Sequence, residues 1–199
     1  MNSPLSLKIF ILVSLFTAMT SVGAFIAIPI PFSPVPVVLQ NFFIIFMGLV
    51  LPPGMSAASV GLYLFLGAVG FPIFAGGTGG FAHFTSPSAG YLISYLPAAI
   101  IGSMIVKKKY REMDKGSSEK GLLKINKTLL TDLFSIFIML IIIYTGGILW
   151  LKYRLNITWI KSILVGVIPF MPGAIVKCAA AVILAPKIRK LLKQEGMLG

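Results

Sequence analysis

The chain has 199 residues, of which 57% are hydrophobic and 11% are charged, and it carries a formal net charge of +12. A bilayer core takes about 20 apolar helical residues to cross, and runs of that kind predict a polytopic α-helical membrane protein rather than a soluble domain. Most of the basic residues lie outside these runs, and they form no recognition motif with aromatic residues, so the charge reflects membrane topology and no nucleic-acid partner is expected.

Six apolar runs predict an all-α membrane protein, with the whole chain, residues 1–199, forming one bundle of six transmembrane helices. The runs cover about residues 7–28, 37–51, 55–69, 91–106, 129–150 and 163–185. The second and third are shorter than a full crossing, which local bilayer thinning or burial within the bundle would accommodate. In the first run, Ser14 and Ala18 form a small-xxx-small pattern that suits close approach of another helix, or equally ordinary internal packing.

The first connection, residues 28–41, predicts a stiff, extended and apolar segment. It contains four prolines: Pro29, Pro31, Pro34 and Pro36. Each proline fixes φ, lacks a backbone donor and disfavours the α region in the residue before it. Such a segment at a membrane edge is either an interfacial plug or the wall of a site, and the two amides that follow it, Gln40 and Asn41, are candidate ligand contacts.

The connection at residues 71–90 is rich in glycine, which allows the backbone to bend freely or to approach a ligand closely. Its Gly-Gly-Thr-Gly-Gly core lacks the lysine of a P-loop and does not join a strand to a helix, so phosphate binding is excluded. His83, the only histidine, has no Cys, Asp or Glu neighbours. It is therefore a poor metal ligand, and we expect a hydrogen-bonding or solvated side chain.

Charge distribution predicts the orientation. Eight of the 17 basic residues lie in residues 107–127, around a flexible loop at Gly116, Ser117 and Ser118, and a further basic cluster follows the last run. By the positive-inside rule both are cytoplasmic, so with six spans both termini are cytoplasmic as well. The unusual segments at residues 28–41, 71–90 and 151–172 then converge on the outer face.

Lys177 interrupts the last apolar run and is interpreted as the one charge embedded in such a run. Pro172 and Gly173 are expected near the N-terminus of the last helix, or at a kink in a longer helix that begins near Trp159. A lysine at that depth costs a few kcal/mol unless it snorkels or meets a partner. All the acids are interpreted as lying in or beside cytoplasmic segments: Glu112, Asp114, Glu119, Asp132 and Glu195. Lys177 is therefore either a snorkelling residue or a cation for an anionic ligand.

Several mechanisms are excluded by what the sequence lacks. No intramembrane carboxylate or histidine relay for proton coupling is recognised, there is no Walker A motif, and no cluster of Asp, Glu or His suits a catalytic or metal centre. We therefore expect neither an enzyme nor a bound cofactor, but a binding subunit whose work is driven by another component.

Four motifs together resemble the BioY family, the biotin-specific S components of energy-coupling factor (ECF) transporters. They are Pro29 to Gln40, Phe71 to Gly77, Pro87 to Ile93 and Pro169 to Lys177. The resemblance implies a six-helix protein of a prokaryotic cell membrane that captures biotin from outside and associates with a transmembrane T component and two ABC-type ATPases. The family's first helix docks on the T component through Ala-x-x-x-Ala, which corresponds here to Ser14 and Ala18. Its last motif usually reads Gly-Asp-x-x-Lys; here Ala174 replaces the acid.

The chemistry of biotin suggests a role for each candidate residue. The carboxylate suits Lys177, although Arg154 or Lys161 could take its place, and the ureido group suits the donors and acceptors of Gln40 and Asn41. The remaining candidates are apolar walls or close backbone approaches: Phe32, Phe74, Gly76, Gly77 and Tyr91. The alternatives are an S component or solitary permease for another small anionic vitamin, and a membrane assembly protein that transports nothing.

Overall fold

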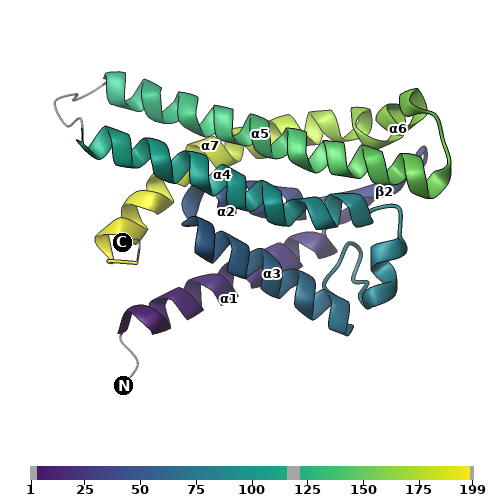
Figure 1. The fold of residues 1–199 in the computed structure, drawn as a ribbon, viewed down its shortest axis with the longest axis horizontal. Helices are drawn as coiled ribbons and strands as arrows, with labels where there is room; N and C mark the ends of the chain where they lie inside the picture. The colour runs from purple at the N-terminus through teal and green to yellow at the C-terminus, as the bar shows by residue number, and fades with distance from the viewer. Residues whose placement is uncertain (1–3, 116–121, 198–199) are drawn as a thin grey trace.

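The computed structural model describes residues 4–115 and 122–197, so the loop predicted to be flexible at Gly116, Ser117 and Ser118 lies outside the described residues. The helices are α1 (Pro4–Phe25), α2 (Gln40–Val50), α3 (Pro53–Val69), α4 (Ala89–Lys115), α5 (Leu122–Leu155), α6 (Trp159–Gly166) and α7 (Met171–Gln194), with the 3-10 turns η1 (Phe81–Thr85) and η2 (Ile168–Phe170) (Figure 1). Four described stretches, in α1, α4, α5 and α6 to α7, are long and apolar enough to span a membrane, whereas α2 and α3 are shorter. The predicted helical membrane class is confirmed.

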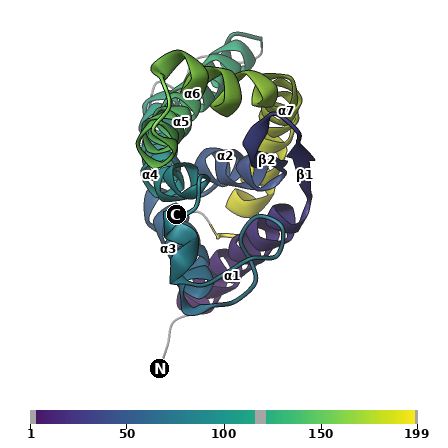
Figure 2. The same ribbon diagram turned by 90° about the vertical axis from the view of Figure 1, so that its right-hand side faces the viewer.

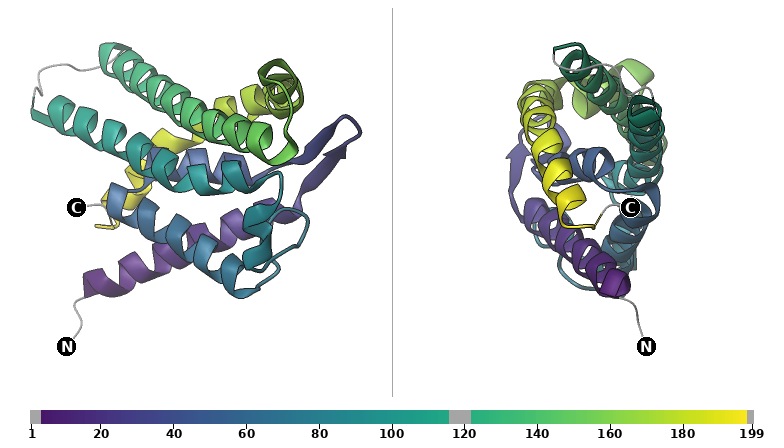
Figure 3. Two further views of the ribbon diagram at one scale, coloured as in Figure 1. Left: turned by 45° about the vertical axis from the view of Figure 1, so that its right-hand side comes forward. Right: turned by 90° about the vertical axis from the view of Figure 1, so that its left-hand side faces the viewer.

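The elements divide between two ends of the bundle. The strands, η1 and α6 lie at one end, and the start of α1 and the end of α7 lie at the other, together with the end of α4 and the start of α5 (Figures 1 and 3). The three unusual connections are thus on the same end of the molecule, as their predicted topology requires.

Helix α2 occupies the centre of the bundle and packs against α1, α4 and α7 (Figure 2). Its residues from Ile44 to Val50 are all buried. It stops because Pro52 and Pro53 lack N–H groups, and Leu51 is extended, with φ −92° and ψ 150°. Pro53 then starts α3.

The Pro-rich segment is an antiparallel hairpin of β1 (Ala27–Ile30) and β2 (Ser33–Val38), in which Ala27 pairs with Val38. Its extended conformation was predicted, but its pairing was not. An isolated two-stranded hairpin is marginally stable, and this one is tied to the bundle because the Ser33 hydroxyl donates to the carbonyl of Val165 at 2.8 Å. The first two predicted spans, residues 7–28 and 37–51, are therefore too long at the hairpin, because the first includes the start of β1 and the second the end of β2.

The last predicted span, residues 163–185, is interrupted. Helix α6 ends at Gly166, η2 follows, and α7 starts at Met171 with Pro172 in its first turn. Pro172 and Gly173 lie near the N-terminus of the last helix, as expected. The helical stretch does begin at Trp159, as the alternative expected, but it breaks at Val167 and η2 before α7 continues it.

Two further charges lie inside the helices, which corrects the prediction that Lys177 is alone. Asp132 is fully buried and accepts two hydrogen bonds from Arg189, at 2.9 and 2.5 Å. Arg189 also donates to the carbonyl of Leu49 at 3.1 Å. That carbonyl would normally bond to the N–H of residue 53, which is a proline, so Arg189 supplies the donor that α2 lacks. Asp132 is therefore a buried member of an ion pair inside the bundle, a role that the sequence did not predict.

Candidate functional site

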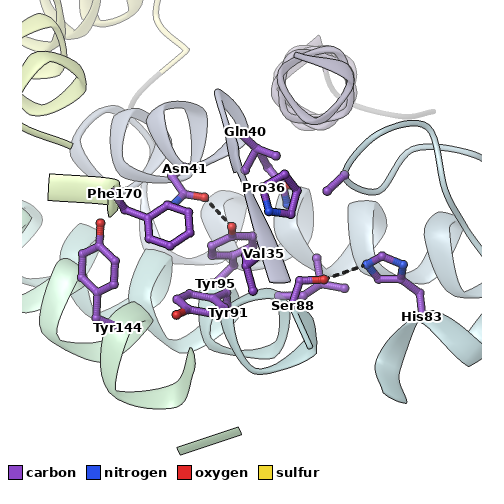
Figure 4. Close-up of a pocket in the computed structure, with 13 residues that line it drawn as sticks. Val35, Pro36, Gln40, Asn41, His83, Ser88, Tyr91, Tyr95, Tyr144 and Phe170 are labelled. Carbon is purple, nitrogen blue, oxygen red and sulfur yellow. Dashed lines mark hydrogen bonds between the residues drawn. The ribbon is translucent and has the colours of Figure 1, made fainter. Parts of the chain in front are cut away.

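A cavity lies at the hairpin end, where β2 and the start of α2 meet the loop before α4, helices α4 and α5, and η2 (Figure 4). It measures about 30 Å³, counted as the space that the centres of water molecules can occupy. It is lined by Val35, Pro36, Val38, Gln40, Asn41, Ala75, His83, Ser88, Tyr91, Leu92, Tyr95, Tyr144 and Phe170. An apolar, aromatic wall with a few convergent polar groups is the usual composition of a small-molecule site.

Two consecutive amides open α2 and reach the cavity. Gln40 is 2% exposed, and its Nε2 is buried without a hydrogen-bond partner among the described residues. Asn41 accepts a hydrogen bond at Oδ1 from the Tyr95 hydroxyl, which leaves its amide nitrogen as a donor (Figure 4). A buried unpaired donor is costly, so Gln40 is the polar group of this cavity that most requires an acceptor.

Aromatic rings of α4, α5 and η2 form one wall. Tyr91 contacts Phe170 and Tyr144, with ring centroids 6.2 and 6.4 Å apart. The Tyr91 hydroxyl donates to the carbonyl of Gly166 at 2.7 Å, which fixes the ring. Gly147 makes room for it, since a Cβ there would lie 2.1 Å from a Tyr91 ring carbon.

The glycine-rich connection contributes Ala75, His83 and Ser88 rather than its glycines. The His83 ring lies between two hydroxyls, with Nδ1 3.1 Å from Thr78 Oγ1 and Nε2 3.3 Å from Ser88 Oγ. Burial lowers the pKa of His83 below its usual value, so the ring is neutral at pH 7. His83 is thus the hydrogen-bonding residue that the sequence predicts.

The predicted cations lie around the cavity rather than in it. Lys177 Nζ donates to the carbonyl of Val38 at 2.6 Å, and so binds β2, the strand of the hairpin that lines the cavity. The Arg154 Nε donates to the carbonyl of Thr85 at 2.7 Å, and Lys161 is exposed. Of the three, Lys177 alone contacts a residue that lines the cavity.

The structure brings Gln40, Asn41 and Tyr91 together, but it does not bring every predicted residue to the wall. Phe32 is 68% exposed at the tip of the hairpin. Phe74 is fully buried beneath the loop, with its ring 4.9 Å from that of His83. Gly76 and Gly77 follow Phe74 in a tight turn and have positive φ, at 71° and 74°.

The polar and aromatic wall residues that were not predicted as site residues include Ser88, Tyr95, Tyr144 and Phe170. Tyr95 follows Tyr91 by four residues and so shares its helix face, a spacing that could have identified it. Tyr144 stands in an isoleucine-rich run and Phe170 between two prolines, where no pattern distinguishes a cavity wall from packing.

The predicted docking residues lie on α1, away from the cavity wall. Ser14 is half-buried and Ala18 is exposed. Around them α1 exposes large apolar side chains, including Phe10, Leu15 and Val22. This face has no partner among the described residues.

Comparison with known proteins places the chain in a family. The BioY family model matches residues 1–194. The probable biotin transporter BioY of Pyrococcus horikoshii is 39% identical over 178 residues, which cover 89% of this chain and 94% of that protein. The biotin transporter BioY of Lactococcus lactis is 32% identical over 170 residues, 85% of this chain and 82% of that protein.

A solved structure matches at the level of the fold as well as the sequence. It is a crystal structure of the S-component for biotin from an ECF-type ABC transporter, with a TM-score of 0.78 and 29% identity, covering 96% of this chain and 95% of that one. The family match over nearly the whole chain and the close relatives lead to one conclusion: the chain belongs to the BioY family.

Proposed function

We propose that this integral membrane protein is the substrate-capture (S) subunit of an ECF-type vitamin transporter and binds biotin in the cavity at its hairpin end. The observation that carries the proposal is the buried Gln40 amide, whose Nε2 lacks a partner among the described residues in a cavity with aromatic walls. Relatives of the family are named biotin transporters, and biotin offers the acceptor that this donor requires.

The ureido ring of biotin fits the amide end of the cavity. Its carbonyl oxygen accepts hydrogen bonds, and Gln40 Nε2 and the amide nitrogen of Asn41 are donors on adjacent residues. The fused rings are flat and apolar on their faces, which suits packing against Tyr91, Tyr95 and Phe170.

The carboxylate of biotin belongs with Lys177. The Lys177 ammonium donates a hydrogen bond to a neutral acceptor, the carbonyl of Val38. A carboxylate is charged and is therefore a stronger acceptor for the same ammonium. Ala174, where the family's motif usually has an acid, is a buried apolar residue, so no carboxylate at that position competes for the lysine. Arg154 and Lys161 are the alternative cations.

Binding requires movement. The cavity of about 30 Å³ is much smaller than the 300 Å³ or more of a typical ligand site. The hairpin is the element best suited to move, because its tip at Phe32 is exposed and because the side-chain hydrogen bonds of Lys177 and Ser33 can be exchanged for others. Exchange of the Val38 carbonyl for the ligand carboxylate would couple the opening to binding.

The remaining parts of the proposal concern assembly and orientation. The basic stretch Lys107–Lys109 lies at the end opposite the hairpin and is cytoplasmic by the positive-inside rule, with both termini beside it and the ligand site outside. The exposed apolar face of α1 around Ser14 and Ala18 docks on the T component, and two ATPase subunits drive uptake. The protein itself has no catalytic role and needs no cofactor.

The direct test is to purify the chain, identify any small molecule extracted from it by mass spectrometry, and titrate the stripped protein with biotin by calorimetry. Loss of the donor in Gln40→Leu should weaken binding by about tenfold to a hundredfold, without lowering thermal stability, since it removes an unpaired polar group. Gln194→Leu, at the exposed end of α7, is the matched control.

Three results would count against the proposal. Extraction of another anionic vitamin would make this an S component of different specificity, and uptake without the ATPases would make it a solitary permease. If neither extraction nor titration detects any ligand, the protein is not a substrate-capture subunit.

A further inference from the structure

A chain of hydroxyls runs through the only histidine beside the cavity. Ser86 Oγ lies 3.0 Å from Ser88 Oγ, which lies 3.3 Å from His83 Nε2, while His83 Nδ1 lies 3.1 Å from Thr78 Oγ1. Thr78 donates in turn to the carbonyl of Ala75 at 3.0 Å. Ala75, His83 and Ser88 line the cavity, and Figure 4 shows the bond between the last two.

The fixed end of this chain determines the direction of every proton in it. A carbonyl oxygen can only accept a hydrogen bond, so the Thr78 hydroxyl donates its proton to the carbonyl of Ala75. Its oxygen must then accept the hydrogen bond from His83 Nδ1. The neutral ring therefore carries its proton on Nδ1, and Nε2 is an acceptor. Ser88 donates its only proton to Nε2 and accepts a hydrogen bond from Ser86, so one lone pair of its oxygen remains to accept a hydrogen bond from a ligand in the cavity that it lines.

We infer that His83 is a positioning residue that holds the Ser88 hydroxyl as a hydrogen-bond acceptor toward the ligand. This rests on the proposed function. The cavity then presents donors at Gln40 and Asn41 and an acceptor at Ser88, which is the complement of a ligand that carries a carbonyl next to an N–H. A cyclic urea has that pattern, and a lactone or a thioether ring does not.

Protonation of His83 reverses the arrangement. Nε2 then donates a hydrogen bond to the Ser88 oxygen, so the Ser88 hydroxyl turns its own proton toward another acceptor. The charged imidazole also places a positive charge near the N–H of the ligand. The elements packed against η1 are α3 and α4, whose titratable side chains at this end are the phenols Tyr63, Tyr91 and Tyr95, and the nearby cation Arg154 is bound to Thr85. The described residues thus offer no carboxylate here to hold a charged imidazole, and its burial favours the neutral ring.

The tautomer can be tested without any ligand. Because the chain contains one histidine, the full-length protein labelled with 15N-histidine and purified through a tag free of histidine gives signals from His83 alone. At pH 7.5 we expect Nδ1 to resonate as a protonated nitrogen and Nε2 as an unprotonated one. A ring protonated at Nε2 would overturn the inference, whatever the outcome of biotin titrations.

Calorimetric titration with biotin between pH 5.5 and 8 tests the consequence for binding, in a range where the carboxylate, with a pKa of about 4.3, stays charged. Wild-type affinity should fall by about tenfold as His83 is protonated, the value of one hydrogen bond. His83→Gln should lose this pH dependence. Ser88→Ala should bind about tenfold more weakly than wild type at pH 8 and approach wild-type affinity as the pH falls. Thr85→Ala should behave as wild type, because the Thr85 side chain is exposed and its hydroxyl bonds to the carbonyl of Ala82, outside this chain.

The outcomes separate this inference from the function beneath it. If affinity rises at low pH, or stays unchanged at a pH where the nitrogen spectrum shows His83 to be protonated, the protein retains its function but His83 does not set the hydrogen-bonding direction of Ser88. Wild-type protein that binds no biotin at any pH refutes the function, and the nitrogen spectrum alone then decides the tautomer.

Discussion

Replacement of Arg189 by methionine should destabilise the fold more than any surface change. Asp132 is 0% exposed and Arg189 is its bidentate partner. Removal of one member of a buried ion pair leaves an uncompensated charge, which costs about 3–5 kcal/mol. The Leu49 carbonyl would also lose its donor, which adds roughly 1 kcal/mol or more.

Cys178 provides the assay. It is the only cysteine and is half-buried in α7, so a thiol-reactive fluorescent dye reports its exposure during heating of the purified protein. Arg189→Met should react at a markedly lower temperature than wild type. Lys190→Met, one residue further and exposed, changes charge equally and should stay within about 0.5 kcal/mol of wild type.

A double variant separates the ion pair from the loss of side-chain volume. Asp132→Leu with Arg189→Met replaces the pair by apolar groups, a change that is often neutral or stabilising, so it should recover most of the stability lost in Arg189→Met. The reasoning is refuted if Arg189→Met unfolds at the same temperature as Lys190→Met, or if the double variant unfolds at as low a temperature as Arg189→Met alone.

Three further predictions follow from other contacts. Lys177→Met should weaken biotin binding in calorimetry by about tenfold or more, the value of a charged hydrogen bond, whereas exposed Lys187→Met should not; equal affinities would assign the carboxylate to another cation. Gly67→Ala should lower the unfolding temperature by the equivalent of about 1–3 kcal/mol, because its Cβ would lie 2.1 Å from the Phe74 ring; an unchanged temperature would mean that the ring can move aside. Ala18→Phe should retain biotin binding but fail to co-purify with the T component, and intact assembly would exclude this face.

The residues that sequence analysis identified in the cavity are those whose chemistry conflicts with their surroundings. Gln40 and Asn41 are amides at the start of an apolar helix, and a polar group in such a place requires a partner. Tyr91 is the first residue of the predicted span at residues 91–106, directly after the glycine-rich connection. These positions could be recognised because a local pattern, read without the fold, already marks them as exceptions.

The residues that were missed depend on long-range packing. Phe170 reaches the cavity because the chain breaks between α6 and α7, and Phe74 is buried because a tight turn folds it under the loop. Asp132 looked like a boundary residue because its partner, Arg189, is 57 positions away. A pair that forms across two helices has no signature within either one.

The pairing of the hairpin could not be predicted either, because it too depends on contacts between residues that are far apart in the sequence. Its prolines predict extension, but the register between β1 and β2 depends on the turn and on contacts with α6 and α7, such as those of Ser33 and Lys177. The prolines therefore predict that each strand is extended, but they do not predict how the two strands pair.

The hairpin carries a second consequence of its composition. A two-stranded sheet has two open edges, and an exposed edge can recruit a strand from another molecule and so begin aggregation. Pro29 in β1 and Pro34 and Pro36 in β2 each remove a backbone donor from a short strand. The prolines that stiffen the rim of the cavity thus also disfavour edge-to-edge pairing between copies crowded in one membrane, so that the hairpin can be exposed without promoting aggregation.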